Sequence, residues 1–206
     1  MKLLKLFLFA VFAISVVFSP YIKSSPDSNG VNSKLVSMAK ADVEVRKILQ
    51  NMSERGLTAS EKIAISKNDK KNTEALKKIL QDNGWDITSN ISKKGLNALF
   101  LIIQHSTHDT EFQEESLVYI QELYSKEKIP GQQLALLTDR VRIAQGKQQL
   151  YGTQADIVNS EIIFKPIEDE LNVDRRRYQL KMPPMELYKK ILEESYGLKE
   201  HGLIDN

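Results

Sequence analysis

One stretch of the sequence combines a carboxylate, a guanidinium group, amides and hydroxyls where a predicted helix runs into a turn. Its polar members are Asp139, Arg140, Gln148, Tyr151, Thr153 and Gln154. Gly152 stands among them, and a glycine can adopt positive φ and let another backbone or a ligand approach closely. A turn that only connects two elements seldom needs so many donors and acceptors. The stretch therefore predicts a site for a polar ligand, although its spacing matches no known catalytic or metal motif.

A second candidate is a carboxylate on the apolar side of a predicted helix. At about 100° per residue, Asp42 lies in the middle of a stripe formed by Leu35, Met38, Val45, Leu49 and Met52. An unpaired buried carboxylate is very costly, so Asp42 needs a partner, and Arg46 follows one turn later. The pair either fixes helix packing or contributes a carboxylate to a pocket.

His105 ends the most apolar predicted helix, and histidine is the side chain that titrates nearest to neutral pH. It is therefore the candidate general acid or base, with Asp139 or Asp42 orienting it. The competing interpretation is a histidine of the core. If the helix continued, His108 and Asp109 would share its face, and such a set can bind a divalent ion. A histidine and an aspartate at this spacing more often form a hydrogen bond, so no metal site is predicted.

Two further polar groups have ordinary explanations as well as functional ones. Asp69 and Asn72 stand at the predicted start of a helix, where a capping side chain is expected. Asp174 begins a run of three arginines, which is either a solvated charged turn or a fork of guanidinium groups for a carboxylate or phosphate. In the second interpretation, Asp174 and Arg176 belong to the ligand site.

Apolar residues at helical spacing predict a mainly α, single-domain bundle of five to six helices. The helices are expected at 35–56, 66–83, 94–105, 112–129 and 132–145, with a last one after Pro183-Pro184. Residues 98–103 are apolar without a break, so their helix should be the central one. The segment 161–167 is short and β-branched, which predicts an isolated strand or extended arm.

The first residues have the layout of a secretory signal. A short basic segment precedes an uncharged apolar run from Leu6 to Phe18, so residues 1–23 predict export to the periplasm or medium. The alternative is an inner-membrane anchor through residues 6–22. A linker at 24–33, a helical domain at 34–197 and a tail at 198–206 are expected to follow. The chain has no cysteine, so an exported domain must be stable without disulfides, as fits a bacterial envelope.

Composition excludes some partners. With 29 lysines and arginines against 27 acidic residues, the net charge of +2 provides no field that would attract nucleic acid. Membrane contact is expected only through an uncleaved N-terminal segment. A hydrophobic fraction of 41% and a charged fraction of 27% are typical of a folded soluble domain rather than a disordered chain.

Together these residues resemble a bacterial domain family of unknown function, over about Leu35 to Leu192. The resemblance rests mainly on Gln148-x-x-Tyr151-Gly152-Thr153-Gln154, preceded by Asp139-Arg140 and followed by Asp174-x-Arg176. This chain has Thr107 where the family commonly has an acidic residue, so an acid assisting His105 would have to come from Asp109. The family implies no reaction, cofactor or partner.

Three functions are compatible with these patterns. The first is binding of a small polar or anionic ligand, with Arg46, Arg140 and Arg176 as charge partners. The second is a hydrolase or lyase in which His105 transfers a proton and an aspartate orients it. The third is a structural or partner-binding envelope protein in which the same groups form only ion pairs. We expect convergence on one pocket of the site residues Asp42, Arg46, His105, Asp139, Arg140, Gln148, Tyr151, Thr153, Gln154, Asp174 and Arg176. No cofactor is predicted.

Overall fold

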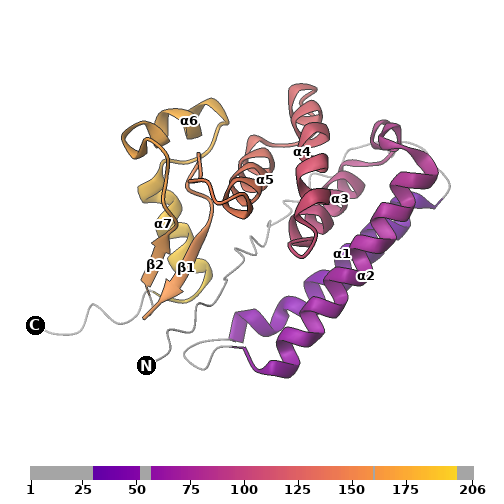
Figure 1. Ribbon diagram of the computed structural model, residues 1–206, viewed down its shortest axis with the longest axis horizontal. Coiled ribbons are helices and arrows are strands. Elements are labelled where there is room, and N and C mark those ends of the chain that lie inside the picture. The colour runs from indigo at the N-terminus through magenta and orange to yellow at the C-terminus, as the bar shows by residue number, and fades with distance from the viewer. Residues whose placement is uncertain (1–29, 52–56, 160, 199–206) are drawn as a thin grey trace, which may run out of the picture. The chain divides into compact units, whose positions relative to one another are not determined.

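The computed structural model describes residues 30–51, 57–159 and 161–198 (Figure 1). These residues form seven α-helices, three short 3-10 helices and one two-stranded sheet, which confirms the mainly α class. They divide into two compact units, 30–134 and 135–198. The predicted signal or anchor segment, most of the linker and nearly all of the predicted tail lie outside the described residues. Within the described part, no helix has the length and apolar character needed to span a membrane.

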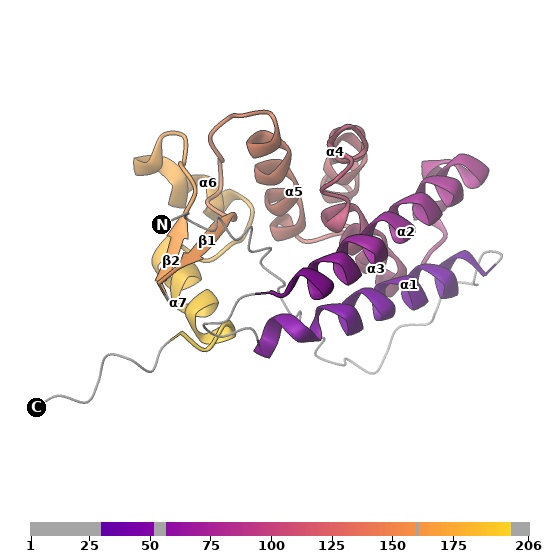
Figure 2. The same cartoon turned by 60° about the horizontal axis from the view of Figure 1, so that its bottom comes forward.

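The N-terminal unit is built on three helices that pack against one another. They are α1 (Val31–Arg46), α2 (Ala59–Asn83) and α3 (Lys93–His105), and α1 lies against both of the others (Figures 1 and 2). Helix α1 begins inside the predicted linker. The 3-10 helices η1 (Lys47–Asn51) and η2 (Trp85–Ser89) and the helix α4 (Thr110–Ser125) complete the unit. Leu99, Ile102 and Ile103 of α3 are buried, as expected for a central helix.

A glycine and an asparagine bring the start of α3 against α1. A Cβ atom at Gly95 would lie only 2.2 Å from Oδ1 of Asn32, so only glycine allows this approach. The same oxygen of Asn32 accepts hydrogen bonds from the backbone N–H of Ser92 at 3.1 Å and from its hydroxyl at 2.7 Å. Ser92 in turn caps α3 by accepting from the N–H of Gly95 at 3.1 Å. A capping side chain of one helix is thus held by the neighbouring helix.

Helix α2 begins well before the predicted start. Thr58 is its N-cap and forms a capping box with Glu61, in which each side chain accepts from the other's backbone N–H. Asp69 and Asn72 therefore lie in the interior of the helix and are buried. The prediction that they cap the helix is wrong, because the first two turns are too weakly apolar to show a helical period. The predicted end at Asn83, before Gly84, is confirmed.

The chain leaves α3 directly after His105. The hydroxyl of Ser106 donates to the carbonyl of Ile102, and Asp109 caps α4 by accepting from the N–H of Phe112 at 3.1 Å. Asp109 also pairs with Lys77 at 2.9 Å, which holds the pKa of this carboxyl below its usual range. His105, His108 and Asp109 consequently do not share one helix face, and the helix on which that metal set depended does not continue.

The C-terminal unit consists of a β-hairpin, two helices and most of α5 (Gly131–Ala144), which begins in the first unit. Strands β1 (Ala155–Val158) and β2 (Glu161–Phe164) pair antiparallel, so the predicted extended segment is one half of a hairpin rather than an isolated strand. Tyr188 and Leu192 of α7 (Met185–Ser195) pack with Ile162 of β2 to form a small core.

A short helix replaces the predicted charged turn. The 3-10 helix η3 (Glu170–Asn172) leads into α6 (Val173–Gln179), which contains the three arginines. The turn interpretation is therefore wrong, and α6 raises the number of α-helices to seven in the described residues. With three arginines in seven residues and few apolar ones, α6 shows no apolar period that would have predicted it.

Two glycines with positive φ allow the energetic cost of backbone strain to be measured apart from that of packing. Gly146 has φ of 73° and nothing within 4 Å of a built Cβ, whereas at Gly152, with φ of 65°, a Cβ would lie 2.5 Å from Sδ of Met185. We expect Gly146→Ala to lower the free energy of unfolding by about 1 to 2 kcal/mol. Gly152→Ala should cost up to about 1 kcal/mol more, because the flexible end of the Met185 side chain must also shift to admit the new methyl group. Urea unfolding of both variants measures the difference, and equal losses would contradict the packing argument.

Candidate functional site

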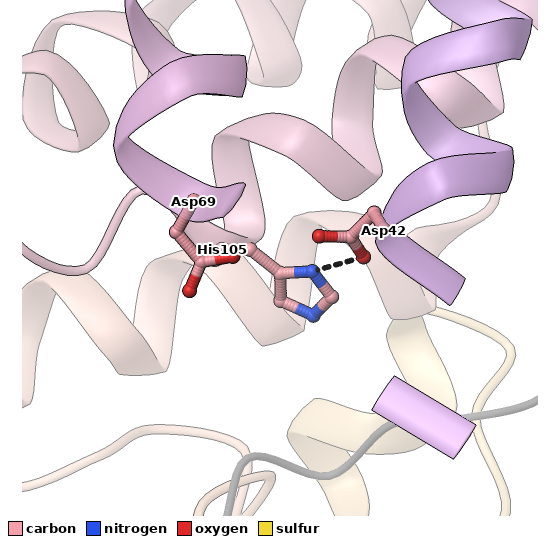
Figure 3. Close-up of side chains that lie close together, drawn as sticks. All are labelled: Asp42, Asp69 and His105. Carbon is pink, nitrogen blue, oxygen red and sulfur yellow. Dashed lines mark hydrogen bonds and ion pairs between the residues drawn. The ribbon is translucent and has the colours of Figure 1, made fainter. Parts of the chain in front are cut away.

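Four charged or titratable side chains meet between the three helices of the N-terminal unit. We call Asp42 and Arg46 of α1, Asp69 of α2 and His105 of α3 the buried ionic cluster; all four residues are buried. Figure 3 shows the side chains of Asp42, Asp69 and His105 pointing toward one another. Three helices thus each contribute at least one member of the cluster.

Arg46 connects the two carboxylates. Its Nη1 donates to Oδ1 of Asp42 at 2.5 Å, and its Nη2 donates to both oxygens of Asp69 at 2.7 and 2.8 Å. The predicted contact with Asp42 is present, and the contact with Asp69 was not predicted. Burial raises the pKa of Asp69, and the nearby Arg46 opposes that rise. The guanidinium group therefore supplies the charge compensation that both buried carboxylates need.

His105 is oriented by Asp42. The imidazole Nδ1 lies 2.7 Å from Oδ2 of Asp42, the oxygen on which Arg46 does not donate. Oδ1 of Asp42 also accepts from Nδ2 of Asn68 at 3.1 Å, so the carboxylate is held from several sides. Of the two aspartates considered for this orienting role, Asp42 is the one in contact with His105. The proton-transfer role of His105 stays a prediction.

Replacing Arg46 tests whether the cluster holds the unit together. We expect Arg46→Met to lower the free energy of unfolding by about 3 to 5 kcal/mol, because it leaves two buried carboxylates without a counter-charge. Lys47→Met is the matched control, since Lys47 is exposed and pairs with the exposed Glu44 on the surface; it should cost less than about 1 kcal/mol. Urea unfolding of both variants provides the comparison, and a small loss for Arg46→Met would show that the cluster does not stabilise the helices.

Asp139 holds the loop of residues 149–154 in the C-terminal unit. Its Oδ1 accepts from the backbone N–H groups of Leu150 at 2.7 Å and Tyr151 at 3.0 Å. Its Oδ2 accepts from the N–H and the hydroxyl of Thr153, both at 2.9 Å. Burial raises the pKa of Asp139, while these hydrogen bonds oppose the rise. Both oxygens are occupied by the loop, which favours a positioning role for Asp139 over proton transfer.

Side-chain amides fix the other end of the same loop. Gln149 donates through Nε2 to the carbonyls of Gln154 at 3.0 Å and Lys165 at 2.7 Å, and its Oε1 accepts from the N–H of Gln154 at 2.8 Å. The predicted residue Gln148 is exposed, and its ligand-binding role stays a prediction. The backbone turns the side chain of Gln149 inward and leaves that of Gln148 exposed, and the sequence pattern does not reveal which of the two adjacent glutamines is buried. The side chain of Gln154 accepts from Nη2 of Arg140 at 3.3 Å.

Two arginines of α6 bind the carbonyl groups of the loop. Arg176 donates through Nε to the carbonyl of Leu150 at 2.7 Å, and Arg177 donates through Nη1 to that of Tyr151 at 2.5 Å. Arg177 also donates through Nε to the carbonyl of Pro183 at 2.6 Å, and its guanidinium lies 4.4 Å from the ring centre of Tyr188. Asp174 accepts from the N–H of Met185 at 2.7 Å. Arg177 was missed because its neighbour Arg176 fitted the family pattern.

The structure thus brings nine of the eleven predicted site residues together as two groups, one in each unit. The other two are Gln148, which is exposed, and Asp174, which accepts from the N–H of Met185. Asp42, Arg46 and His105 form the first group with Asp69. The second surrounds the loop of residues 149–154 and contains Asp139, Arg140, Tyr151, Thr153, Gln154 and Arg176, together with Gln149 and Arg177. Convergence of both groups on a single pocket stays a prediction.

Replacing Asp139 tests its role in the loop. An asparagine would turn an amide N–H₂ group toward backbone donors, so Asp139→Asn should lower the free energy of unfolding by at least about 3 kcal/mol. Asp156→Asn is the control, because Asp156 pairs with Lys165 at 2.9 Å in a partly exposed position and should cost less than about 1 kcal/mol. Chemical denaturation of both variants decides, and similar losses would argue against a loop-holding carboxylate.

The fold and these contacts define a mainly helical protein with a buried polar network in each of two units. The chain belongs to a family of unknown function, DUF6624, whose family model matches residues 29–201. This confirms the expected membership of a domain family without an assigned activity. Comparison with curated proteins and with solved structures found no similar protein.

Proposed function

We propose that the protein binds a small anionic molecule through Arg177 in the C-terminal unit. The observation that carries the proposal is a buried charge without a counter-charge: Arg177 is 0% exposed, and no carboxylate of the described residues forms an ion pair with it. Its Nη2 has no hydrogen-bond acceptor in the described part of the chain. A buried guanidinium without a counter-ion is costly, and a bound carboxylate or phosphate group would supply one.

The electrostatic surroundings of Arg177 support an anion rather than a neutral ligand. Burial lowers the pKa of Arg177, and Asp174 and Asp139 only partly oppose this effect. Asp174 accepts from the N–H of Met185, and Asp139 accepts from the loop N–H groups. Neither carboxylate accepts a hydrogen bond from Arg177, whose described acceptors are the carbonyls of Pro183 and Tyr151. A bound anion would supply the counter-charge that Arg177 lacks in the described residues.

Neighbouring polar side chains would complete the site. Arg140 and Gln154 are buried and in contact with each other, and both Arg140 and Arg177 act electrostatically on the hydroxyl of Tyr188. Planar guanidinium groups match the two oxygens of a carboxylate or phosphate, and the amide of Gln154 adds orientation. Because Arg177 is closed to solvent, entry of the anion requires local opening of the unit. The hydrolase or lyase alternative stays a prediction centred on His105 and Asp42.

Thermal unfolding with added anions tests the proposal. Inorganic phosphate or succinate, compared with chloride at equal ionic strength, should raise the Tm of the wild type. Arg175→Met is the control, because Arg175 is an exposed arginine of the same helix, and this variant should respond like the wild type. A ligand at about 100 times its Kd stabilises by about 2.7 kcal/mol. Arg177→Met should lose this response, and Arg177→Lys should retain part of it, because a lysine keeps the charge without the planar fork.

Two outcomes would count against anion binding at Arg177. One is an equal response of wild type and Arg177→Met, which would place the anion elsewhere. The other is the absence of any anion response in the wild type by thermal unfolding and isothermal titration calorimetry. Arg177 would then serve only to join the loop to Pro183 and Tyr188 through the contacts described above.

A further inference from the structure

The buried ionic cluster of the N-terminal unit has a donor set suited to a metal ion. Asp42, Asp69 and His105 each offer one ligand atom, and these atoms lie within 4.8 Å of one another. Three atoms that each lie about 2.1 Å from one metal are about 3.4 to 3.6 Å apart in tetrahedral or trigonal geometry, so the widest pair of the set would have to close by roughly 1.3 Å on an ion. The side chains come from three different helices and already point toward one another (Figure 3).

The charges of the cluster also call for a cation. Two ionised carboxylates and one guanidinium leave one negative charge if His105 is neutral. A proton fits between Nδ1 of His105 and Oδ2 of Asp42, which are 2.7 Å apart. A metal ion bound to both atoms at about 2.1 Å would replace this hydrogen bond and hold the two atoms about 3.4 Å apart in tetrahedral geometry. A divalent metal ion would change this net charge from one negative to one positive, and one further anionic ligand on the ion would bring it to zero.

Arg46 is compatible with a metal ion because it occupies other positions of the carboxylates. It donates to Oδ1 of Asp42 and leaves Oδ2 facing the imidazole. A carboxylate has about four lone-pair sites, so Asp69 can accept Nη2 of Arg46 and still bind a cation. Hydrogen bonds to the ligating carboxylates are common around metal ions, where they orient the ligands.

The side-chain N–H₂ group of Asn72 lacks a hydrogen-bond acceptor in the described residues. Asn72 lies on α2 one turn after Asp69, on the same face of the helix. The residue is buried, and its Nδ2 has no acceptor in the described residues. An anionic ligand in the open fourth position of a metal ion with three protein ligands would provide an acceptor on this face.

We propose that Asp42, Asp69 and His105 bind a divalent transition-metal ion, with Zn²⁺ as the reference ion and Arg46 positioning the two carboxylates. The imidazole nitrogen favours Zn²⁺ and related ions over Mg²⁺ and Ca²⁺, which prefer oxygen ligands alone. The proposal is independent of anion binding at Arg177, which concerns the other unit.

The test uses the tag-free full chain, stripped with a chelator and titrated with ZnCl₂ by isothermal titration calorimetry and thermal unfolding. We expect one Zn²⁺ per chain and a rise in Tm that EDTA reverses, with no response to MgCl₂. His105→Asn and Asp69→Asn should weaken Zn²⁺ binding at least ten-fold. His108→Asn should bind like the wild type, because His108 is exposed and lies outside the cluster.

Loading the wild type with Co²⁺ keeps the proposal falsifiable if the cluster variants do not fold. Bound Co²⁺ with few ligands, including a nitrogen, should give visible absorption bands that excess Zn²⁺ removes. Zn²⁺ binding that is unchanged in His105→Asn would overturn the proposal. A wild type that binds neither Zn²⁺ nor Co²⁺ would overturn it too, and would leave the cluster as a set of ion pairs and hydrogen bonds between three helices.

Discussion

The N-terminal unit depends on a single guanidinium group placed between two buried carboxylates. Arg46 joins α1 to α2 through Asp69, and it neutralises Asp42, which in turn holds the last residue of α3. Around this point the helices are apolar, so Asp42, Asp69 and Arg46 depend on one another for charge compensation. We expect the cluster to favour one relative setting of the three helices, because a slide of one helix by one turn would separate its hydrogen-bonded pairs, whereas apolar packing alone tolerates more than one setting.

The C-terminal unit uses neutral backbone groups for the same purpose. The loop of residues 149–154 makes few regular backbone hydrogen bonds, so its N–H groups are taken by Asp139 and its carbonyls by Arg176 and Arg177. Side chains thus replace the hydrogen-bonding role that a strand or helix would provide. Most of the polar residues of this segment form hydrogen bonds that hold the loop itself. Arg177 differs from them because its Nη2 has no hydrogen-bond acceptor in the described residues.

Whether a contact can be predicted from the sequence depends on how far apart its two residues lie along the chain. Asp42 and Arg46 are predictable as a pair because both lie on one helix, four residues apart. Their link to Asp69 is not, because the capping box at Thr58 lies in a weakly apolar segment and hides the true start of α2. Buried Gln149 and Arg177 stand beside chemically identical neighbours, and only the conformation of the turn and of α6 selects between them. The mainly helical class follows from periodicity, whereas the partners between elements do not.

The two polar networks differ in the sequence separation of the residues that they bring into contact. The contact between His105 and Asp42 joins residues 63 apart, while that between Asp139 and Thr153 spans 14. Closing the longer segment costs about 1.3 kcal/mol more in chain entropy. The loop of residues 149–154 can therefore form early and locally during folding, whereas the ionic cluster needs all three helices in place. We therefore expect Arg46 to become buried late in the folding of its unit, because burial of its charge requires both aspartates to be in place.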